Sequence, residues 1–412
     1  MKKDNIEKSA IKKSSIKNST TKNWQWLVFG EDWGRHPSST QHLMKCIAVH
    51  HQLYWVNSIG LRRPKLNDSK RIIEKFKQLK NAQKNDFNQG EPMLMNDVQP
   101  LGILAPVAIP WPGSQIAYVI NRLLLTYQTR ALLAKNEIED KVPRILWLSL
   151  PTARCVAGSL EEDLLVYYAG DDFSALSGVD HKQVSAEEDA LVEQADIIFA
   201  ASDNIARQFP QDKTYVLPHG VDLAHFSSRH ERPDNYPKSD LVVGYYGSIT
   251  AWLDFELITF LAESRPDVTF VFIGKIDIVD CDIFNLNNLI HLPDMPHEQL
   301  IQYAANWQVS LIPFVDNEQI RACNPLKLRE YLAIGRPIIS TRYPAVLPFT
   351  DCIYVADDKD EMLAQLNQAL TLSSKTLAKL KSRSRERVEG ATWQARCELV
   401  IKLLSAKMDV QI

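Results

Sequence analysis

Short apolar runs alternate with amphipathic stretches along most of the chain. Near the start, the apolar runs Trp24–Phe29 and Tyr54–Asn57 flank the stretch Ser38–His50, whose apolar residues follow a helical period. Strands that alternate with helices are typical of parallel βαβ units. The pattern continues with an amphipathic helix near Gln115–Leu133, and it predicts further strands at Leu101–Val107, Arg144–Leu148, Leu164–Tyr168, Asp196–Ala201 and Thr214–Leu217.

The same alternation starts again in the second half of the chain. The segment His219–Ser239, rich in Pro, His and Asp, is typical of an interdomain connection. After it, strands are predicted at Leu241–Tyr246, Val268–Ile273, Leu289–Leu292, Val309–Pro313, Pro337–Ser340 and Cys352–Val355. A chain of 412 residues is too long for one ordinary core. We therefore predict a disordered polar tail (1–22), an N-terminal domain (23–218), a linker (219–239), a C-terminal domain (240–374) and a last helical segment (375–412).

Both predicted domains are doubly wound, Rossmann-like α/β units. Ligands of such sheets bind outside the carboxyl ends of the strands, so two of these domains in series predict a binding cleft between them. The loops expected to line it follow the strands, at Gly30–Ser39, Leu150–Arg154, Gly170–Phe173, Gly247–Asp254, Gly274–Asp277 and Phe314–Asn324.

Composition narrows the class of protein. The net charge of -3 gives no general basis for nucleic-acid binding, and no apolar run approaches the ~18 residues of a membrane span. The lysine-rich tail is interpreted as a solvated segment or, alternatively, as a basic tether to an anionic membrane surface. The six cysteines lie far apart, without metal-binding spacing, which favours reduced thiols and a cytoplasmic location.

One short helix in the second half carries the clearest local signal. Asn324 is a suitable N-cap, Pro325 suits the first turn, and Gly335 with Pro337 predicts the end. Carboxylates are favoured at a helix start, yet here Arg321, Lys327 and Arg329 come first and no acid precedes Glu330.

A bound phosphate would complete this helix start, because free N–H groups and cations there attract an anion. Lys327 and Glu330 share one helix face, where they could hold a diphosphate and a ribose diol respectively. The alternatives are a surface helix with a scattered basic start, or an acid of the same chain in place of the phosphate.

At these residues the chain resembles the GT-B fold retaining glycosyltransferases of the group 1 family. The segments that carry the resemblance are PLKLREYLAIGRPIIST, TYVLPHGVDLAHF, ADIIFAAS, GYYGSITAWLDFELITFLA and VTFVFIG. The segments FGEDWGRHPSSTQHL, WVNSIGLRRP and LLVYYAGDDFSAL are similar to the branch of teichuronic acid and exopolysaccharide glycosyltransferases. The resemblance runs from about Trp24 to the C-terminus.

The resemblance implies a metal-independent reaction that retains anomeric configuration. The nucleotide sugar, linked to UDP or GDP, would bind the C-terminal domain as a co-substrate, with no further cofactor, and the acceptor would bind the N-terminal domain. The last helix would cross back to the N-terminal domain. Glu330 would bind the ribose, Asn324 to Lys327 the diphosphate, and Gly247 with Ser248 would form a small-residue loop. The donor-binding set is Gly247, Ser248, Arg321, Asn324, Pro325, Leu326, Lys327 and Glu330.

Two departures from the family pattern concern the donor sugar and the diphosphate. Many members carry a second glutamate eight positions before the ribose-binding one, where this chain has Ala322, with Glu318 nearby but out of register. Many also carry an Arg and a Lys after the Gly-Ser loop, but Ile249–Glu256 contains neither. Lys327 and Arg321 would then carry more of the phosphate charge.

The N-terminal half offers candidates for the acceptor side. The loop after the first strand contains Gly34, Arg35, His36, Ser38 and Ser39, and is either an active-site loop or a simple cap for the following helix. Catalytic residues stay unknown, with Asp171, Asp172 and His36 as the candidates.

Other motifs are weaker. His219 is interpreted as a packing residue or a cleft residue. Two short DxD motifs, at 280–282 and 358–360, lie in peripheral loops, so no metal site is predicted.

The leading interpretation is a glycosyltransferase that acts on a polysaccharide or a lipid-linked glycan. Such acceptors lie at the inner leaflet, which allows peripheral contact with that membrane surface. The alternatives are a nucleotide-sugar epimerase and a catalytically inactive homologue that serves as a partner subunit. The sequence leaves the sugar, the base and the acceptor undetermined.

Overall fold

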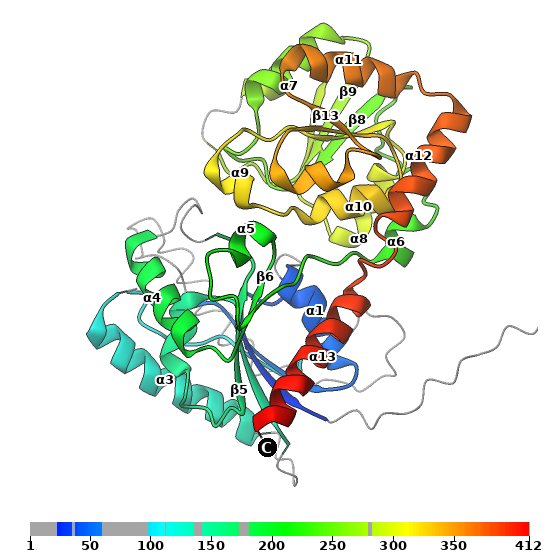
Figure 1. Ribbon diagram of the computed structural model, residues 1–412. Coiled ribbons are helices and arrows are strands. Elements are labelled where there is room, and N and C mark those ends of the chain that lie inside the picture. The colour runs from blue at the N-terminus through cyan, green and yellow to red at the C-terminus, as the bar shows by residue number, and fades with distance from the viewer. Residues whose placement is uncertain are drawn as a thin grey trace, which may run out of the picture.

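The computed structural model describes residues 23–34, 38–59, 98–111, 113–135, 142–172, 181–278 and 282–411. Figure 1 shows two α/β domains, one above the other, with the last helix lying against the lower, N-terminal domain. The predicted tail (1–22) falls outside the described residues.

The N-terminal domain is built on a seven-stranded sheet of order β3-β2-β1-β4-β5-β6-β7 whose paired strands are parallel. Every residue of the central strand β1 is buried, as expected where helices cover both faces. Its strands are β1 (Gln25–Phe29), β2 (Gln52–Val56), β3 (Gly102–Leu104), β4 (Arg144–Leu148), β5 (Leu164–Ala169), β6 (Ile197–Ala200) and β7 (Thr214–Val216). Its described helices are α1 (Ser39–Ala48), α3 (Gln115–Ala134), η4 (Pro151–Val156), α4 (His181–Gln194) and α5 (Asp203–Ala206).

The C-terminal domain repeats the architecture with a six-stranded parallel sheet of order β10-β9-β8-β11-β12-β13. Its strands are β8 (Val242–Tyr246), β9 (Thr269–Ile273), β10 (Leu289–Leu292), β11 (Val309–Ile312), β12 (Ile338–Thr341) and β13 (Tyr354–Ala356). The described helices of the second half are α6 (Leu223–Ser227), α7 (Phe255–Ser264), η5 (Asp282–Asn285), α8 (His297–Ala304), α9 (Glu318–Ala322), α10 (Leu326–Ile334), η6 (Pro344–Phe349), α11 (Lys359–Leu370), α12 (Ser374–Glu386) and α13 (Trp393–Gln411). In both sheets the strand order reverses beside the first strand of the domain, so each sheet has a switch point at its carboxyl edge.

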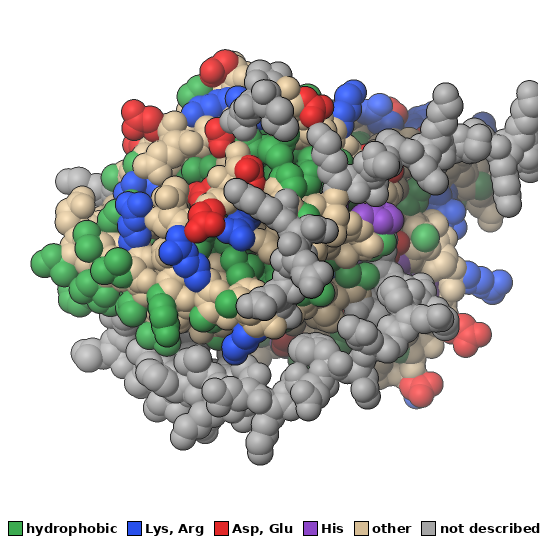
Figure 2. All heavy atoms as spheres, turned by 90° about the horizontal axis from the view of Figure 1, so that it is seen from below, with side chains coloured by type: hydrophobic (Ala, Val, Ile, Leu, Met, Phe, Trp, Pro, Cys, Tyr) green, Lys and Arg blue, Asp and Glu red, His purple; other side chains and the backbone are tan. Residues whose placement is uncertain are grey.

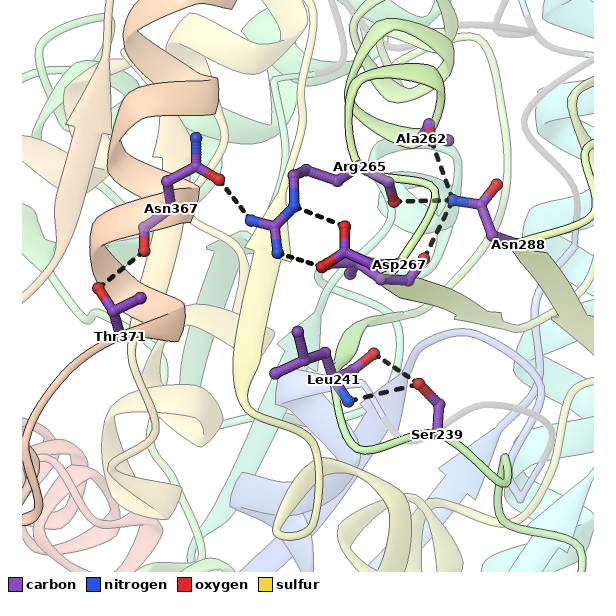
Figure 3. A network of polar contacts seen from close by, with 9 residues as sticks. Ser239, Leu241, Ala262, Arg265, Asp267, Asn288, Asn367 and Thr371 are labelled. Atoms are coloured by element: carbon purple, nitrogen blue, oxygen red, sulfur yellow. Dashed lines mark hydrogen bonds and ion pairs between the residues drawn. The ribbon is translucent and has the colours of Figure 1, made fainter.

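A polar network fixes the turn between α7 and β9 in the C-terminal domain (Figure 3). Arg265 donates two hydrogen bonds to Asp267, at 2.8 and 2.6 Å, and a third to Asn367 of α11. The amide nitrogen of Asn288 lies 2.9 to 3.1 Å from the carbonyl oxygens of Ala262, Arg265 and Val268. These contacts satisfy the carbonyl groups where α7 ends and hold the edge of the sheet to α11.

The predicted last helical segment is two helices rather than one. Helix α12 contacts α10 of the C-terminal domain, whereas α13 contacts α1 of the N-terminal domain (Figure 1). Trp393 and Leu404 of α13 belong to the same apolar cluster as Trp26 of β1. The predicted crossing back to the N-terminal domain is therefore confirmed.

One carboxyl group of the N-terminal domain is buried with no cationic partner among the described residues. Glu188 of α4 is 9% exposed and accepts a hydrogen bond from the hydroxyl of Tyr167 on β5. Burial, with the negative charges of Asp172 and Asp189, raises the pKa of Glu188 to about 7 despite that hydrogen bond. The folded protein therefore favours the protonated form of Glu188 more than the unfolded chain does.

Glu188→Gln should stabilise the protein more at high pH than at low pH. With a folded pKa of about 7 and an ordinary value of 4.5, the wild type loses stability as the pH rises from 4.5 to 7. Above this range the variant should gain about 2–3 kcal/mol relative to the wild type, and at about pH 5 it should gain little. Thermal unfolding at several pH values measures this, with the exposed Glu193→Gln on the same helix as control. The same shift in melting temperature at every pH would contradict the assignment.

Candidate functional site

A cleft of about 660 Å³ lies between the two domains. Its walls come from loops at the carboxyl ends of strands and from the first residues of α1 and α10, which is where two facing Rossmann-like sheets bind ligands. Of the predicted donor-binding residues, the cleft is lined by Gly247, Ser248, Asn324, Pro325, Leu326, Lys327 and Glu330.

Helix α10 begins in this cleft without a side-chain cap among the described residues. Pro325, not Asn324, occupies the N-cap position, so the predicted cap was wrong. The Asn324 amide instead donates to the carbonyl of Ala201 at 2.8 Å and accepts from Arg329 at 2.7 Å. The predicted end is confirmed, because Gly335 is left-handed with φ 75°. The first N–H groups of α10 therefore stay available for an anion.

Lys327 lies against aromatic rings and the loop that contains Gly247. Its Nζ donates to the Tyr245 hydroxyl at 2.7 Å and sits 4.1 Å from the centre of that ring. A Cβ at Gly247 (φ 129°) would come within 2.7 Å of the same Nζ. No carboxylate of the described residues lies within ion-pair distance of Lys327. The ammonium group therefore keeps an uncompensated charge beside the uncapped helix start.

Glu330, one turn further along α10, is a buried and ionised carboxylate. It is 5% exposed, accepts a hydrogen bond from the Tyr246 hydroxyl, and pairs with Nε2 of His297 at 2.7 Å. Burial alone would raise the pKa of Glu330, but the charge and hydrogen bond of His297, with that of Tyr246, lower it. Burial opposes protonation of His297, and the charge of Glu330 outweighs it, so the pKa of His297 is raised. Each carboxylate oxygen has two acceptor positions, so Glu330 can still accept hydroxyl hydrogen bonds.

Two cations differ from the prediction. Arg321 does not line the cleft; it forms a two-bond ion pair with Asp316, at 2.6 Å for each bond, and both side chains are exposed. Lys275 lies in the loop Gly274–Asp277, which was expected to line the cleft, but it was not named as a donor-binding residue. It does line the cleft, and its Nζ lies 3.6 Å from the Asp277 carboxylate. Its backbone carbonyl accepts from the N–H of Ile249 at 2.9 Å. Lys275 therefore stands beside the loop that lacks the expected Arg and Lys.

The start of α5 and the end of α9 join the two domains. Asn204 donates to the carbonyl of Arg321 at 2.9 Å, and Ser202 donates to the carbonyl of Ala322 at 3.3 Å. The side chain of Ala322 is buried, and Gln319 from the preceding turn lines the cleft. The position of the missing glutamate is thus part of a domain contact.

On the N-terminal side, Ser38 caps α1 as predicted, accepting from the N–H of Gln41 at 3.2 Å. Ser39 lies 2.6 Å from Nδ1 of His219, and both are buried. Burial and the nearby charge of Arg329 lower the pKa of His219 to about 3, so its imidazole is neutral. Gly34 does not line the cleft. Arg35 and His36 fall outside the described residues.

The two predicted acidic candidates diverge. Asp171 lines the cleft, whereas Asp172 accepts a hydrogen bond from Gln208 at 3.0 Å and does not line it. The Asp171 side chain is reached by water inside the cleft, but the surrounding protein still removes much of its hydration. That desolvation, with the charges of Glu31 and Asp172, raises the pKa of Asp171. Glu31 also lines the cleft, so two acidic side chains stand on this wall, whereas Lys327 and Lys275 stand on the opposite wall beside Asp294 and Glu330.

Within the described part of the chain, no group of three or more His, Cys, Asp or Glu side chains is placed to hold a metal ion. Of the two DxD motifs, residues 280 and 281 fall outside the described residues. In the other motif Asp358 caps α11, accepting from the N–H of Glu361 at 2.8 Å.

No protein-family model matches the chain. The chain is similar to TuaH of Bacillus subtilis (strain 168), whose name assigns it to glycosyl transfer in teichuronic acid biosynthesis. The two are 25% identical over 221 residues, which span 48% of this chain and 56% of TuaH.

Solved structures match nearly the whole length at low identity. HepE of Anabaena, in complex with UDP and glucose, superposes with a TM-score of 0.65 at 11% identity, covering 92% of this chain and 99% of HepE. Sucrose-phosphate synthase of Thermosynechococcus elongatus gives 0.63 at 15% identity, covering 93% and 100%. The Escherichia coli trehalose-6-phosphate protein bound to UDP-2-fluoro glucose gives 0.59 at 14% identity, covering 93% and 99%. The chain therefore has the GT-B fold, with two Rossmann-like domains.

Gly274→Ala should disrupt the donor-side wall. Gly274 has φ 150°, and a Cβ there would lie 2.1 Å from the carbonyl oxygen of Gly247. Because backbone must move, we expect a loss of about 2 kcal/mol or more of unfolding free energy and a melting temperature lower by several degrees. Gly390→Ala is the control, since no atom lies within 4 Å of its added Cβ. Equal melting temperatures for the two variants would refute the close approach.

Proposed function

We propose that this protein is a glycosyltransferase that moves a sugar from a nucleoside diphosphate to a polysaccharide or lipid-linked glycan. The observation that carries the proposal is on α10. A helix start without a side-chain cap, a lysine without an ion pair among the described residues, and a buried ionised carboxylate line one cleft there. A nucleoside diphosphate carries the complementary groups in the same order. Its diphosphate would match the helix start and Lys327, and its ribose diol would match Glu330.

The diphosphate would lie at the start of α10. Backbone N–H groups and the helix dipole favour an anion there, and Lys327 adds a full positive charge. Lys275 lines the same cleft and can supply a second. As the glycosidic bond breaks, the leaving group gains negative charge, and one preorganised donor of this kind is worth about 3–4 kcal/mol. These cations support a reaction in which protein groups, rather than a metal ion, stabilise the leaving group.

The ribose would lie at Glu330, one helical turn (about 5.4 Å) beyond the diphosphate. Because Glu330 is held by Tyr246 and His297, its remaining acceptor positions are fixed in direction. Met295 and Leu300 line the cleft on the His297 side and offer apolar surface for a base. The neighbours HepE and the Escherichia coli protein are named as complexes with UDP or a UDP sugar, which makes uridine the first base to test.

The acceptor would lie against the N-terminal wall. Asp171 points into the cleft with a raised pKa, which suits a group that takes a proton from an attacking hydroxyl. We propose retention of configuration, with departure and attack on the same face, and we name no protein nucleophile. The partial similarity to TuaH supports a cell-surface polysaccharide as the acceptor class.

Calorimetric titration with UDP and GDP tests the donor site. We expect Lys327→Ala and Glu330→Gln to weaken binding of the preferred nucleotide about tenfold or more, which is 1.4 kcal/mol. Arg321→Ala is the matched control, because this arginine pairs with Asp316 outside the cleft and should bind like the wild type. Folding of each variant is checked by its melting temperature, since Glu330 is buried. A folded wild type that binds neither nucleotide would refute the donor site and favour an inactive partner subunit.

Asp171→Asn should separate acceptor chemistry from donor binding. The amide keeps the size of the side chain but cannot accept the proton, so turnover with acceptor should fall about 100-fold or more. Nucleotide affinity should stay within about twofold, since Asp171 lies on the wall opposite to Lys327. Asp172→Asn is the control, because Asp172 is turned toward Gln208. Unchanged turnover in Asp171→Asn would remove this residue from the mechanism.

A further inference from the structure

Helix α3 of the N-terminal domain turns its apolar side to the solvent. Large apolar side chains recur at helical spacing and stay exposed, with Ile116 at 74%, Leu123 at 68% and Tyr127 at 76%. The full exposed set on this face is Ile116, Val119, Ile120, Leu123, Leu124 and Tyr127. A surface helix ordinarily buries such a stripe and exposes its polar side. Helix α3 therefore carries an apolar stripe in solvent in addition to the buried Ala117 and Leu125.

The side of α3 that faces the domain carries polar residues with fixed partners. Asn121 is buried; its side-chain oxygen accepts from the N–H of Ile109 at 2.7 Å, and its amide donates to the Ile109 carbonyl at 2.9 Å. Gln128 does the same with Val107, at 2.8 and 2.9 Å. These paired hydrogen bonds fix both the rotation of the helix and the loop beside it. The exposure of the apolar side is thus a built feature of the domain.

The loop held in this way extends the apolar surface. Val107 and Trp111 are exposed, and the loop leads directly to Ser114, the N-cap of α3. Figure 2 shows hydrophobic side chains gathered along the left of the face seen from below, the side on which α3 lies in Figure 1, with Lys and Arg side chains next to them. We call α3 and residues 107–111 the α3 surface.

Charge and aromatic content indicate what binds there. Helix α3 contains no acidic residue, and its charged residues are Arg122 and Arg130, both on its exposed part. Arg130 donates to the carbonyl of Ser159 at 3.1 Å and pairs with the exposed Glu161 at 3.3 Å, and Arg122 bonds only to the Ser159 hydroxyl among the described residues. Trp and Tyr, here Trp111 and Tyr127, are the residues favoured between lipid tails and water. No helix among the described residues combines the length and apolar content needed to cross a bilayer.

We infer that the α3 surface docks onto an anionic lipid bilayer, with α3 lying in the interface and its apolar side turned to the acyl chains. The arginines would meet lipid phosphates at the edge of the apolar stripe. The loop 107–111 follows β3 and leads into α3, so this end of the surface lies at the carboxyl edge of the sheet, the edge that faces the cleft. If the proposed function holds, a lipid-linked acceptor would reach the cleft from the same bilayer.

Vesicle co-sedimentation of the full chain tests the inference, with vesicles of phosphatidylcholine alone and of phosphatidylcholine mixed with phosphatidylglycerol. The wild type should bind the mixed vesicles. The affinity of the double variant Leu123→Glu/Tyr127→Glu for these vesicles should be lower by roughly tenfold or more, because two apolar anchors are lost and two negative charges are added. Leu347→Glu is the matched control, an exposed leucine of the C-terminal domain at 43% exposure that should leave vesicle binding unchanged. The difference should persist in about 1 M salt, where the Debye length is about 3 Å and the lysine-rich first 22 residues contribute little.

Several outcomes would overturn the inference. Sedimentation of the wild type with neither vesicle is one, and equal binding by the double variant and the wild type is another. Light scattering gives a third: the wild type is a dimer that binds no vesicle, and the double variant is a monomer. That result would assign the α3 surface to a contact with a second copy of the chain. Because every exchanged side chain is exposed, the melting temperature and the UDP affinity of the double variant should equal those of the wild type. If the wild type does not bind UDP, this would count against the proposed function but would not change the conclusion from vesicle binding.

Discussion

The orientation of the two domains depends on a stack of rings at the point where the chain crosses between them. His42 of α1 stacks on Trp393 of α13, with ring centres 5.0 Å apart and 9° between the planes, and its centre lies 5.5 Å from that of His297. His297 in turn holds Glu330. Burial and the charge of His297 lower the pKa of His42 to about 3, so His42 takes part as a neutral ring. The proton that stabilises the charge of Glu330 therefore stays on His297. At this contact the C-terminal side of the cleft is tied to the N-terminal domain through ring packing rather than through charge.

The two walls of the cleft differ in charge. Lys327, Lys275, Asp294 and Glu330 line the C-terminal side, whereas Asp171 and Glu31 line the N-terminal side, whose described lining residues include no Lys or Arg. Direct ion pairing across the cleft would neutralise both sets, but no such pair is formed among the described residues. The separation matches a group transfer in which negative charge leaves toward one wall and a proton leaves toward the other. The same separation is hard to explain in a surface whose only task is to hold a partner subunit.

The sequence predicted correctly the features that depend mainly on residues close together in the chain. Gly335 ends α10 where it was expected, because a left-handed residue needs only its own backbone freedom, and alternation of apolar runs predicted both sheets. The errors concern the choice of side-chain partners, which the pattern of residue types leaves open. Asn324 is not the cap because Ala201 and Arg329 take its side chain, and Arg321 leaves the site because Asp316 lies within reach. Lys275 lies in the predicted cleft loop Gly274–Asp277, but the pattern does not show which side chain of a loop faces the cleft.

Helix α3 shows a further limit of prediction from the sequence. Its helical period was visible in the sequence, but such a period defines two faces of the helix and does not show which face is buried. Asn121 and Gln128 fix the choice, because their side chains form paired hydrogen bonds with the backbone of Ile109 and Val107. Leu125 shares the buried face, whereas Ile116, Leu123 and Tyr127 stay exposed. The N-terminal domain thus carries both the outward apolar surface and the wall with Asp171, while the ring contact of His42 with His297 sets the donor side against it.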